Sequence, residues 1–331
     1  MHTAHNVDLA PHTTFGVRAL CDTLVTVRST QELAEALESY PEARILGGGS
    51  NILCTSDVHG PVIHLRLMGV TKTDTLVTAQ AGESWHGLVT WCVERGLGGL
   101  ENLALIPGTV GAAPMQNIGA YGVEQDACCA GVTVMDRRTR ELIRLLPTDC
   151  AFGYRTSRFK QEWRNRYVIT EVQYRLSNAP DYHVHTEYRD VAEELAARHC
   201  SQPSLRDVYE AVVAIRQRKL PDPASIGNAG SFFKNPVVLA SQAAALRDVH
   251  PQMPTYPQSD GTVKIAAAWL IDQCGWKGYR EHDAGVHDRQ ALVLVNHGTA
   301  VGAEILDLAN RIQQSVVERF GIPLETEVNV W

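Results

Sequence analysis

The chain has 331 residues, of which 44% are apolar and 20% charged, the composition of an ordinary soluble globular protein. Thirty lysines and arginines against 37 aspartates and glutamates give a formal charge of −7, which argues against a nucleic-acid-binding or membrane-surface protein. No signal peptide and no apolar run of about 18 residues is evident. The eight cysteines show no CxxC pair or zinc spacing and the histidines no HExxH spacing, so we expect reduced thiols, no metal and a cytoplasmic protein. At about 150 residues per domain, the length predicts roughly two domains.

The first 100 residues combine helix signals with short apolar runs. Ser29 and Glu32 form a capping box that predicts a helix, which Pro41 ends. Ser84 predicts the start of a second helix, with Gly96 just past its end. Strands are expected at 44–46, 62–65 and 76–79, with a further apolar step at 52–53.

The middle of the chain contains an unusual loop. Residues 96–122 are dense in glycine, proline and small side chains, which inside a compact domain is typical of a binding loop or lid. A hairpin is expected at 132–135 and 141–145, and a strand at 167–176.

Pro221 and Pro223 give the clearest boundary signal. Before them, Ser204 and Asp207 cap a predicted helix. After them we expect a helix over 263–273, a strand over 291–295, an amphipathic helix over 302–320 and a last strand over 325–330. Strands and helices mixed without regular alternation favour an α+β fold.

Two glycine-rich loops are candidate phosphate sites. In the first, Gly47 to Asn51 follow a predicted strand, where backbone N–H groups can approach a phosphate. Ile52 occupies the sixth position, so this is no dinucleotide-binding fingerprint, and a P-loop motif is absent. The second loop spans 107–111 and 117–122. Two such loops suit a long diphosphate-containing cofactor, but spacing alone leaves two unrelated turns equally open.

Two further motifs are ambiguous. Ser231 and Lys234 match the S-x-x-K pattern of penicillin-interactive serine enzymes, but the S-D-N and K-T-G motifs are missing, which disfavours acylation chemistry. Five cations between Arg155 and Arg166 are typical of a solvated face. One of them can still meet an anionic substrate, because arginine binds carboxylates and phosphates bidentately.

Seven longer segments carry a resemblance to a known family. They are LGGGSN (46–51), GLENLALIPGTVGAAPMQNIGAYG (99–122), FGYRTSRFK (152–160), RKLPDP (218–223), GNAGSFFKNP (227–236), KIAAAWLIDQCG (264–275) and HDRQALVLVN (287–296). In this order they closely resemble the UDP-N-acetylenolpyruvoylglucosamine reductases over nearly the whole chain. An insertion between about 178 and 205 resembles the longer, Tyr-loop branch of that family.

The resemblance implies an α+β fold with a vanillyl-alcohol-oxidase/PCMH-type, two-lobed FAD-binding module over 1–219, its lobes spanning about 1–67 and 68–219. A C-terminal α+β substrate-binding domain would cover 220–331, with its last strand returning toward the flavin. The implied enzyme is a monomer that binds FAD noncovalently, uses NADPH as co-substrate and reduces the enolpyruvyl ether of a UDP-sugar in peptidoglycan precursor synthesis. Two alternatives are an FAD-dependent oxidase of the same fold and a non-catalytic UDP-sugar-binding protein.

The resemblance also implies roles for individual residues. The expected catalytic residues are Arg155, which would hold the enolpyruvyl carboxylate, Ser231, the proton donor, and Glu327. The expected FAD-binding residues are Gly47, Gly48, Gly49, Ser50, Asn51, Gly108, Thr109, Val110, Gly111, Asn117, Ile118, Gly119, Tyr121, Gly122, Ile169 and Arg216. Those expected to bind the UDP-sugar are Tyr188, Lys219, Asn235, Tyr256, Lys277 and Gln290.

Overall fold

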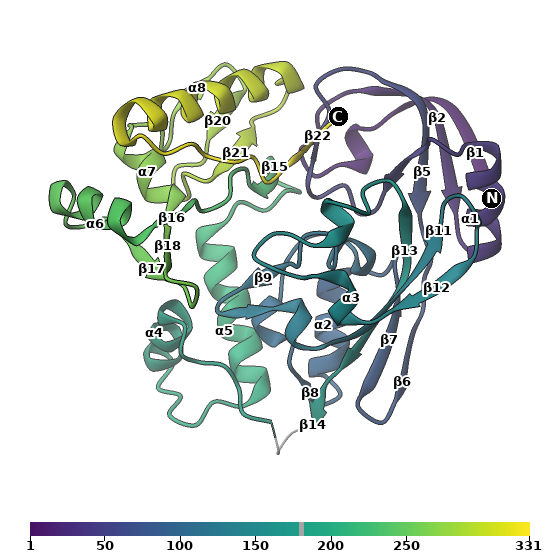
Figure 1. Ribbon diagram of the computed structural model, residues 1–331, viewed down its shortest axis with the longest axis horizontal. Coiled ribbons are helices and arrows are strands. Elements are labelled where there is room, and N and C mark those ends of the chain that lie inside the picture. The colour runs from purple at the N-terminus through teal and green to yellow at the C-terminus, as the bar shows by residue number, and fades with distance from the viewer. Residues whose placement is uncertain (179–181) are drawn as a thin grey trace. The chain divides into compact units, whose positions relative to one another are not determined.

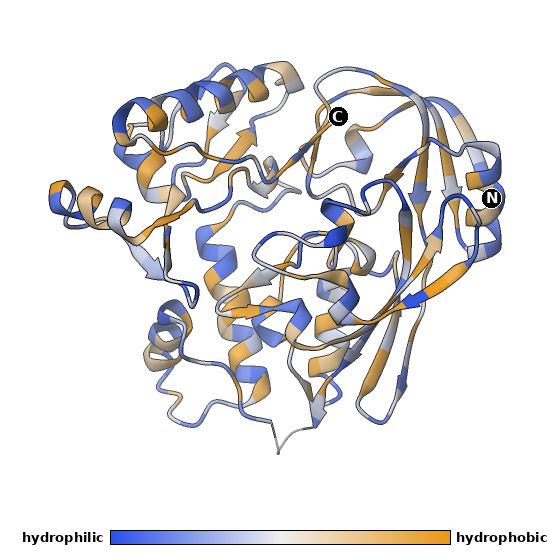
Figure 2. Ribbon diagram, viewed as in Figure 1, coloured by the Kyte–Doolittle hydropathy of each residue, from blue (hydrophilic) through white to orange (hydrophobic). Residues whose placement is uncertain are grey.

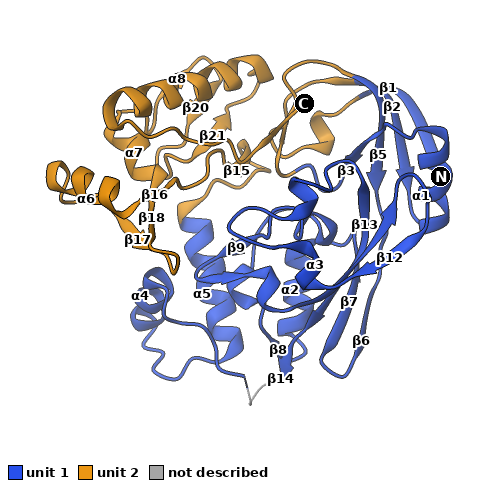
Figure 3. Cartoon of the chain, viewed as in Figure 1, with its two compact units in different colours: residues 1–7, 21–49, 59–218 blue, residues 8–20, 50–58, 219–331 orange. Residues whose placement is uncertain are grey.

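The computed structural model of the chain describes residues 1–178 and 182–331. The described chain divides into two compact units (Figure 3). Unit 1 comprises 1–7, 21–49 and 59–218, and unit 2 comprises 8–20, 50–58 and 219–331. The units are therefore discontinuous in sequence, whereas the expected domains, 1–219 and 220–331, are continuous; those domain ranges stay a prediction.

Unit 1 contains two main β-sheets (Figure 1). One has the strand order β12-β11-β13-β7-β6, with every neighbouring pair antiparallel. The other has the order β1-β2-β5-β3, in which β3 and β5 are parallel. The strands are β1 (His2–Asp8), β2 (Leu20–Val27), β3 (Arg44–Leu46), β5 (Val58–Leu65), β6 (Val70–Thr73), β7 (Leu76–Gln80), β8 (Leu97–Gly98), β9 (Gly119–Ala120), β10 (Val123–Glu124), β11 (Cys129–Asp136), β12 (Leu142–Leu145), β13 (Tyr167–Arg175) and β14 (Ser177–Asn178).

The helices of unit 1 are α1 (Thr30–Ser39), α2 (Trp85–Val93), α3 (Pro147–Cys150), α4 (Arg189–Ala197) and α5 (Leu205–Lys219). The larger core of this unit joins α2 and α5 to the strands of the five-stranded sheet. Trp85 and Tyr174 are fully buried there, with ring centroids 5.7 Å apart in an edge-to-face contact. Buried aromatic rings in this geometry stabilise a core beyond their area alone.

Unit 2 has a second core around its longest helix, α8 (Gly302–Phe320). Apolar and polar residues alternate along α8 (Figure 2). The remaining elements are β4 (Ile52–Leu53), β15 (Gly227–Ser231), β16 (Val237–Leu239), α6 (Ala240–Val249), β17 (Thr255–Pro257), β18 (Thr262–Ile265), α7 (Ala267–Gln273), β19 (Arg280–Glu281), β20 (Ala284–Val286), β21 (Val293–Asn296) and β22 (Asn329–Val330). An antiparallel sheet has the order β15-β21-β20-β19, and a smaller one the order β16-β18-β17.

The α+β class is confirmed, and the capping signals located their helices correctly. The Ser29 hydroxyl accepts the Glu32 N–H at 3.1 Å at the start of α1. Ser84 caps α2 in the same way through Gly87 N–H, and Gly96, beyond its end, has a φ of 68°. The predicted apolar face of α8, which includes Ile305, Ile312 and Phe320, is buried.

Other predictions were wrong or incomplete. Residues 263–265 belong to strand β18 rather than to a helix, and α7 begins only at Ala267. The β-branched Val263 and Ile265 suit a strand, and sheet pairing with β16 and β17 overrides the apolar helical pattern. The last strand is only β22, although Thr326 forms an isolated bridge with Phe233. Strands β1, β2 and β6 and helices α4 and α6 had no predicted counterpart.

Candidate active site

Gly47 and Gly48, from the part of the first glycine-rich loop that belongs to unit 1, lie close to the second loop. A Cβ atom built on Gly48 would lie 3.0 Å from Gly108 Cα, and one on Gly47 would lie 2.8 Å from Thr109 Oγ1. The second loop is held in place by the segment before α2, because Gly108 O accepts Trp85 N–H and Val110 N–H donates to Glu83 O. The two loops thus form a narrow cradle, in which a side chain on Gly47 or Gly48 would meet the Gly108 backbone or the Thr109 side chain. Such a cradle fits a diphosphate, whose oxygens accept backbone N–H groups.

A buried polar network shapes the rest of the second loop. The Asn117 side chain is fully buried, donates to Glu124 Oε2 at 2.8 Å and accepts from Gln125 Nε2 at 3.1 Å. Its φ of 46° lies in the left-handed region, which asparagine tolerates better than most residues. This network fixes the turn that carries the expected flavin-lining residues 117–122.

Tyr121 and Arg216 meet next to this turn. Burial raises the pKa of the Tyr121 phenol, while the hydrogen-bonded Arg216 guanidinium acts in the opposite direction. Burial lowers the pKa of Arg216, whose Nε donates to Leu105 O at 3.2 Å. A cation held among buried groups suits an electron-rich aromatic ligand or an anion.

Arg155 also contacts the second loop. Its backbone is left-handed, with a φ of 51°, and its Nη2 donates to Gly119 O at 2.6 Å. A left-handed backbone is strained for a residue other than glycine, and such strain is often found at functional sites. The structure therefore brings one expected catalytic residue to the loop expected to line the flavin.

The other two expected catalytic residues lie together in unit 2. Ser231 ends β15, and the chain that continues from it runs antiparallel to the segment containing Glu327. Glu327 N–H donates to Phe232 O at 2.8 Å, and Lys234 N–H donates to Glu325 O at 2.9 Å.

Asn51, from the first glycine-rich loop, joins this pair of segments. Its Nδ2 donates to Glu327 O at 3.2 Å, and Asn51 O accepts both the backbone and the side-chain N–H of Asn329 at 3.0 Å. The parallel pairing of β22 with β4 continues the contact. A residue expected to bind FAD and the backbone of an expected catalytic acid are thus joined directly.

The residues expected to bind the UDP-sugar are more dispersed. Tyr188 precedes α4 and packs edge-to-face on Tyr121 with ring centroids 5.4 Å apart. Tyr256 is exposed on β17. Three others already make local contacts: Asn235 Oδ1 caps α7 through Ala267 N–H, Lys277 pairs with Asp272, and Gln290 O accepts Val293 N–H. Lys219 ends α5. Ile169, which was expected to bind FAD rather than the sugar, is buried on β13.

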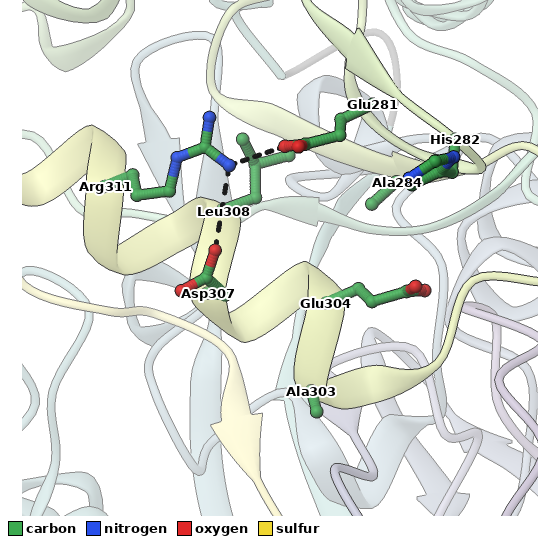
Figure 4. Close-up of a pocket in the computed structure, with 8 residues that line it drawn as sticks. All are labelled: Glu281, His282, Ala284, Ala303, Glu304, Asp307, Leu308 and Arg311. Atoms are coloured by element: carbon green, nitrogen blue, oxygen red, sulfur yellow. Dashed lines mark hydrogen bonds and ion pairs between the residues drawn. The ribbon is translucent and has the colours of Figure 1, made fainter.

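One surface pocket lies elsewhere in unit 2, between α8 and the β19–β20 hairpin (Figure 4). It has a volume of about 390 Å³, and none of the expected site residues lines it. Arg311 pairs with Glu281 at 2.5 Å and with Asp307 at 3.7 Å, but three carboxylates against one arginine leave the lining acidic. The pocket therefore does not coincide with the expected catalytic residues.

Comparison with known proteins identifies the family. Residues 222–331 match the C-terminal domain of UDP-N-acetylenolpyruvoylglucosamine reductase, and residues 21–145 match an FAD binding domain. UDP-N-acetylenolpyruvoylglucosamine reductases from Chromobacterium violaceum and Pseudomonas syringae pv. tomato are 51% and 48% identical to the chain. These alignments cover 97% of both chains in the first case, and 100% of this chain and 99% of the relative in the second. The chain belongs to the UDP-N-acetylenolpyruvoylglucosamine reductase family.

A solved structure agrees with this assignment. The UDP-N-acetylenolpyruvylglucosamine reductase from Thermus caldophilus superposes with a TM-score of 0.69 at 27% identity, covering 100% of this chain and 98% of the other. Like this family, the chain is an FAD-dependent oxidoreductase, and its FAD-binding match spans both glycine-rich loops. The Gly48–Gly108 cradle fits that cofactor. None of the described helices is long and apolar enough to cross a membrane.

Sequence reasoning missed Asn102, which lies within a segment used for the resemblance. Its side chain is 1% exposed and donates to two backbone carbonyls from different parts of unit 1. The sequence signal that was available is the polar pair Glu101-Asn102 within an otherwise apolar stretch, because buried polar groups require partners.

Proposed function

We propose that the chain catalyses the NADPH-dependent reduction of UDP-N-acetylenolpyruvoylglucosamine to UDP-N-acetylmuramate, a step of peptidoglycan precursor synthesis in the cytoplasm. The supporting observation is the arrangement in unit 2, where the segments that carry Ser231 and Glu327 are paired and tied to Asn51 of the first glycine-rich loop. Full-length similarity to reductases of that name supports the same substrate.

When bound, FAD supplies hydride transfer from NADPH to the enolpyruvyl methylene carbon. Negative charge then develops beside the substrate carboxylate, which Arg155 would hold. The bond to Gly119 O orients the guanidinium, whose five N–H donors form a fork that matches a carboxylate. Arg155 would thereby stabilise the charge in the transition state.

Ser231 would donate the proton that completes the reduction. A serine hydroxyl is a weak acid, but the carbanionic enol that it protonates is strongly basic. Gly230, with a φ of 70°, and the Asn228 side chain, which accepts Gly230 N–H at 2.9 Å, together shape the turn that presents Ser231. Glu327 would assist the proton transfer or shape the charge around the carboxylate.

The diphosphate and sugar of the substrate would be held by Tyr188, Lys219, Asn235, Tyr256, Lys277 and Gln290. Two lysines supply the positive charge that a diphosphate requires. We further propose a monomeric enzyme that holds FAD noncovalently.

A visible spectrum followed by an NADPH oxidation assay tests the proposal. The purified protein should be yellow, release all its flavin on denaturation, and oxidise NADPH much faster when the UDP-enolpyruvyl sugar is added. Turnover of an alcohol with oxygen and without NADPH would instead indicate an FAD oxidase. A colourless protein that binds the UDP-sugar would indicate a non-catalytic binding protein.

A further inference from the structure

Asn102 connects two segments of unit 1 that are distant in sequence. Its Nδ2 donates to Tyr121 O at 3.2 Å and to His185 O at 3.0 Å. With 1% of its surface exposed, the side chain is out of reach of solvent. One buried amide thus bridges the loop expected to line the flavin and the 182–188 segment that leads to Tyr188.

A second anchor holds the same segment. The Tyr182 ring covers Gly98 so closely that a Cβ there would lie 2.2 Å from Tyr182 Cδ1. Burial, together with the neighbouring Glu101 carboxylate, raises the pKa of the Tyr182 phenol, which therefore stays protonated. Glu101 in turn accepts Gly99 N–H at 2.8 Å, so it is fixed to the backbone beside Gly98.

Both anchors lie close to Tyr188 in the fold. Tyr188 is 41% exposed, and its ring packs edge-to-face on the Tyr121 ring. Asn102 binds the backbone of Tyr121, one partner in that ring contact. It also binds the backbone of His185, three residues before Tyr188, the other partner. An exposed ring gains little from the core, so backbone anchors such as these contribute to its position.

We propose that Asn102 is a positioning residue that docks the 182–188 segment onto the Tyr121 turn and thereby holds Tyr188 ready for the UDP-sugar. The inference rests on the proposed function, in which Tyr188 binds substrate. Asn102 does not touch the reacting atoms, and through Tyr188 it acts on binding of the sugar.

Steady-state and rapid-mixing kinetics of Asn102→Ala test this role. Loss of the amide leaves two buried carbonyls without their donor, so the KM for the UDP-sugar should rise about tenfold to a hundredfold. Flavin reduction at saturating NADPH should stay within about twofold of the unsubstituted enzyme. A fall in kcat with unchanged KM would overturn the proposal.

A double-mutant cycle with Tyr188→Ala identifies the route of the effect. If Asn102 acts through Tyr188, Asn102→Ala should add little to the KM of a Tyr188→Ala enzyme. Fully additive effects would overturn the proposal. Gly98→Ala should also raise the KM, because the new Cβ would displace the Tyr182 ring and so loosen the second anchor.

Stability and docking are separated by two further measurements. Asn296→Ala removes another buried amide, which donates to Phe15 O in unit 2, and should lower the melting temperature without coupling to Tyr188.

Hydrogen exchange of the FAD-loaded protein should be faster over 182–188 in Asn102→Ala than in the unsubstituted protein. Unchanged exchange would overturn the docking role. Because this measurement needs no substrate, it can succeed even if the proposed function fails.

Discussion

At the scale of single residues, the position of the Ser231 side chain depends on the conformation of the turn that precedes it. Gly230 is left-handed with open space around it, and Asn228, buried beneath the turn, donates to Pro221 O and Ile226 O. The family resemblance predicted the serine as a proton donor, whereas the turn that carries it became evident only from these contacts.

Ser231→Ala should separate the two half-reactions. Because the proton is needed only in the second half-reaction, which follows reduction of the flavin, FAD binding and flavin reduction by NADPH should stay nearly normal. Reoxidation of the flavin by the UDP-sugar should slow by about 100-fold to 10,000-fold, as expected for loss of a positioned general acid. Rapid mixing measures each step. Ser231→Cys, which keeps a donor, should retain more activity, and an unimpaired second step in Ser231→Ala would remove the serine from the mechanism.

The buried thiols give a prediction on pH. Burial raises the pKa of Cys92 and Cys150 to about 12, and that of Cys128 and Cys129 to about 11, from an ordinary value of 9.0. Since the folded state binds these protons more tightly, their contribution to stability is complete below pH 9 and is lost as the pH rises toward 12.

Urea unfolding at pH 8, 9 and 10 measures that loss. The urea midpoint should fall above pH 9. The free energy of unfolding should decrease by at most about 1.4 kcal/mol per pH unit for each thiol. Cys150→Ala is the control, because it has one titrating thiol fewer and should lose less stability over the same range. An unfolding midpoint that is constant from pH 8 to pH 10 would contradict the assignment.

At the scale of elements, helices were predicted better than strands. Capping boxes are local signals, and Ser204 with Asp207 starts α5 as expected through paired hydrogen bonds. The edge strand β6 and strand β1 have mostly exposed residues and so lack the apolar alternation that predicts a strand. Their existence depends on partners supplied from elsewhere in the sheet.

The cradle formed by the glycine-rich loops predicts that Gly48→Ala weakens FAD binding. In Gly48→Ala the new methyl group would lie 3.0 Å from Gly108 Cα, and backbone cannot move aside as a flexible side chain would. Overpacking of about 1–3 kcal/mol predicts FAD binding weaker by about fivefold to 150-fold. Titration of the apoprotein with FAD, followed by flavin fluorescence, measures the effect.

Gly87→Ala is the matched control for that variant. Gly87 lies within α2, where alanine is the better helix former, and its Cβ would meet the Ser84 side chain, with Cβ at 3.3 Å and Oγ at 3.5 Å, rather than backbone of another segment. This variant should bind FAD normally. If Gly48→Ala binds FAD as tightly as Gly87→Ala does, the loops do not form the cofactor cradle.

At the scale of the whole molecule, the family resemblance predicted the fold class, the cofactor and the candidate residues, but not their connections. Asn51 and Glu327 are 276 residues apart and share a hydrogen bond that depends on the pairing of β22 with β4. No local pattern encodes such a pairing, because it follows from topology. For the same reason Asn102 was overlooked: its importance lies in two carbonyls that are 19 and 83 residues away.

The whole enzyme should follow ping-pong kinetics. NADPH and the UDP-sugar both carry a diphosphate, yet the sequence offers one FAD-type module and no second nucleotide fingerprint. The two substrates should therefore take turns, giving parallel double-reciprocal lines and inhibition at high UDP-sugar concentration. Intersecting lines, which require a ternary complex, would contradict a shared site. Asn102→Ala provides an internal check: because inhibition and turnover would use the same contacts to the sugar, the inhibitory concentration should rise by the same factor as the KM.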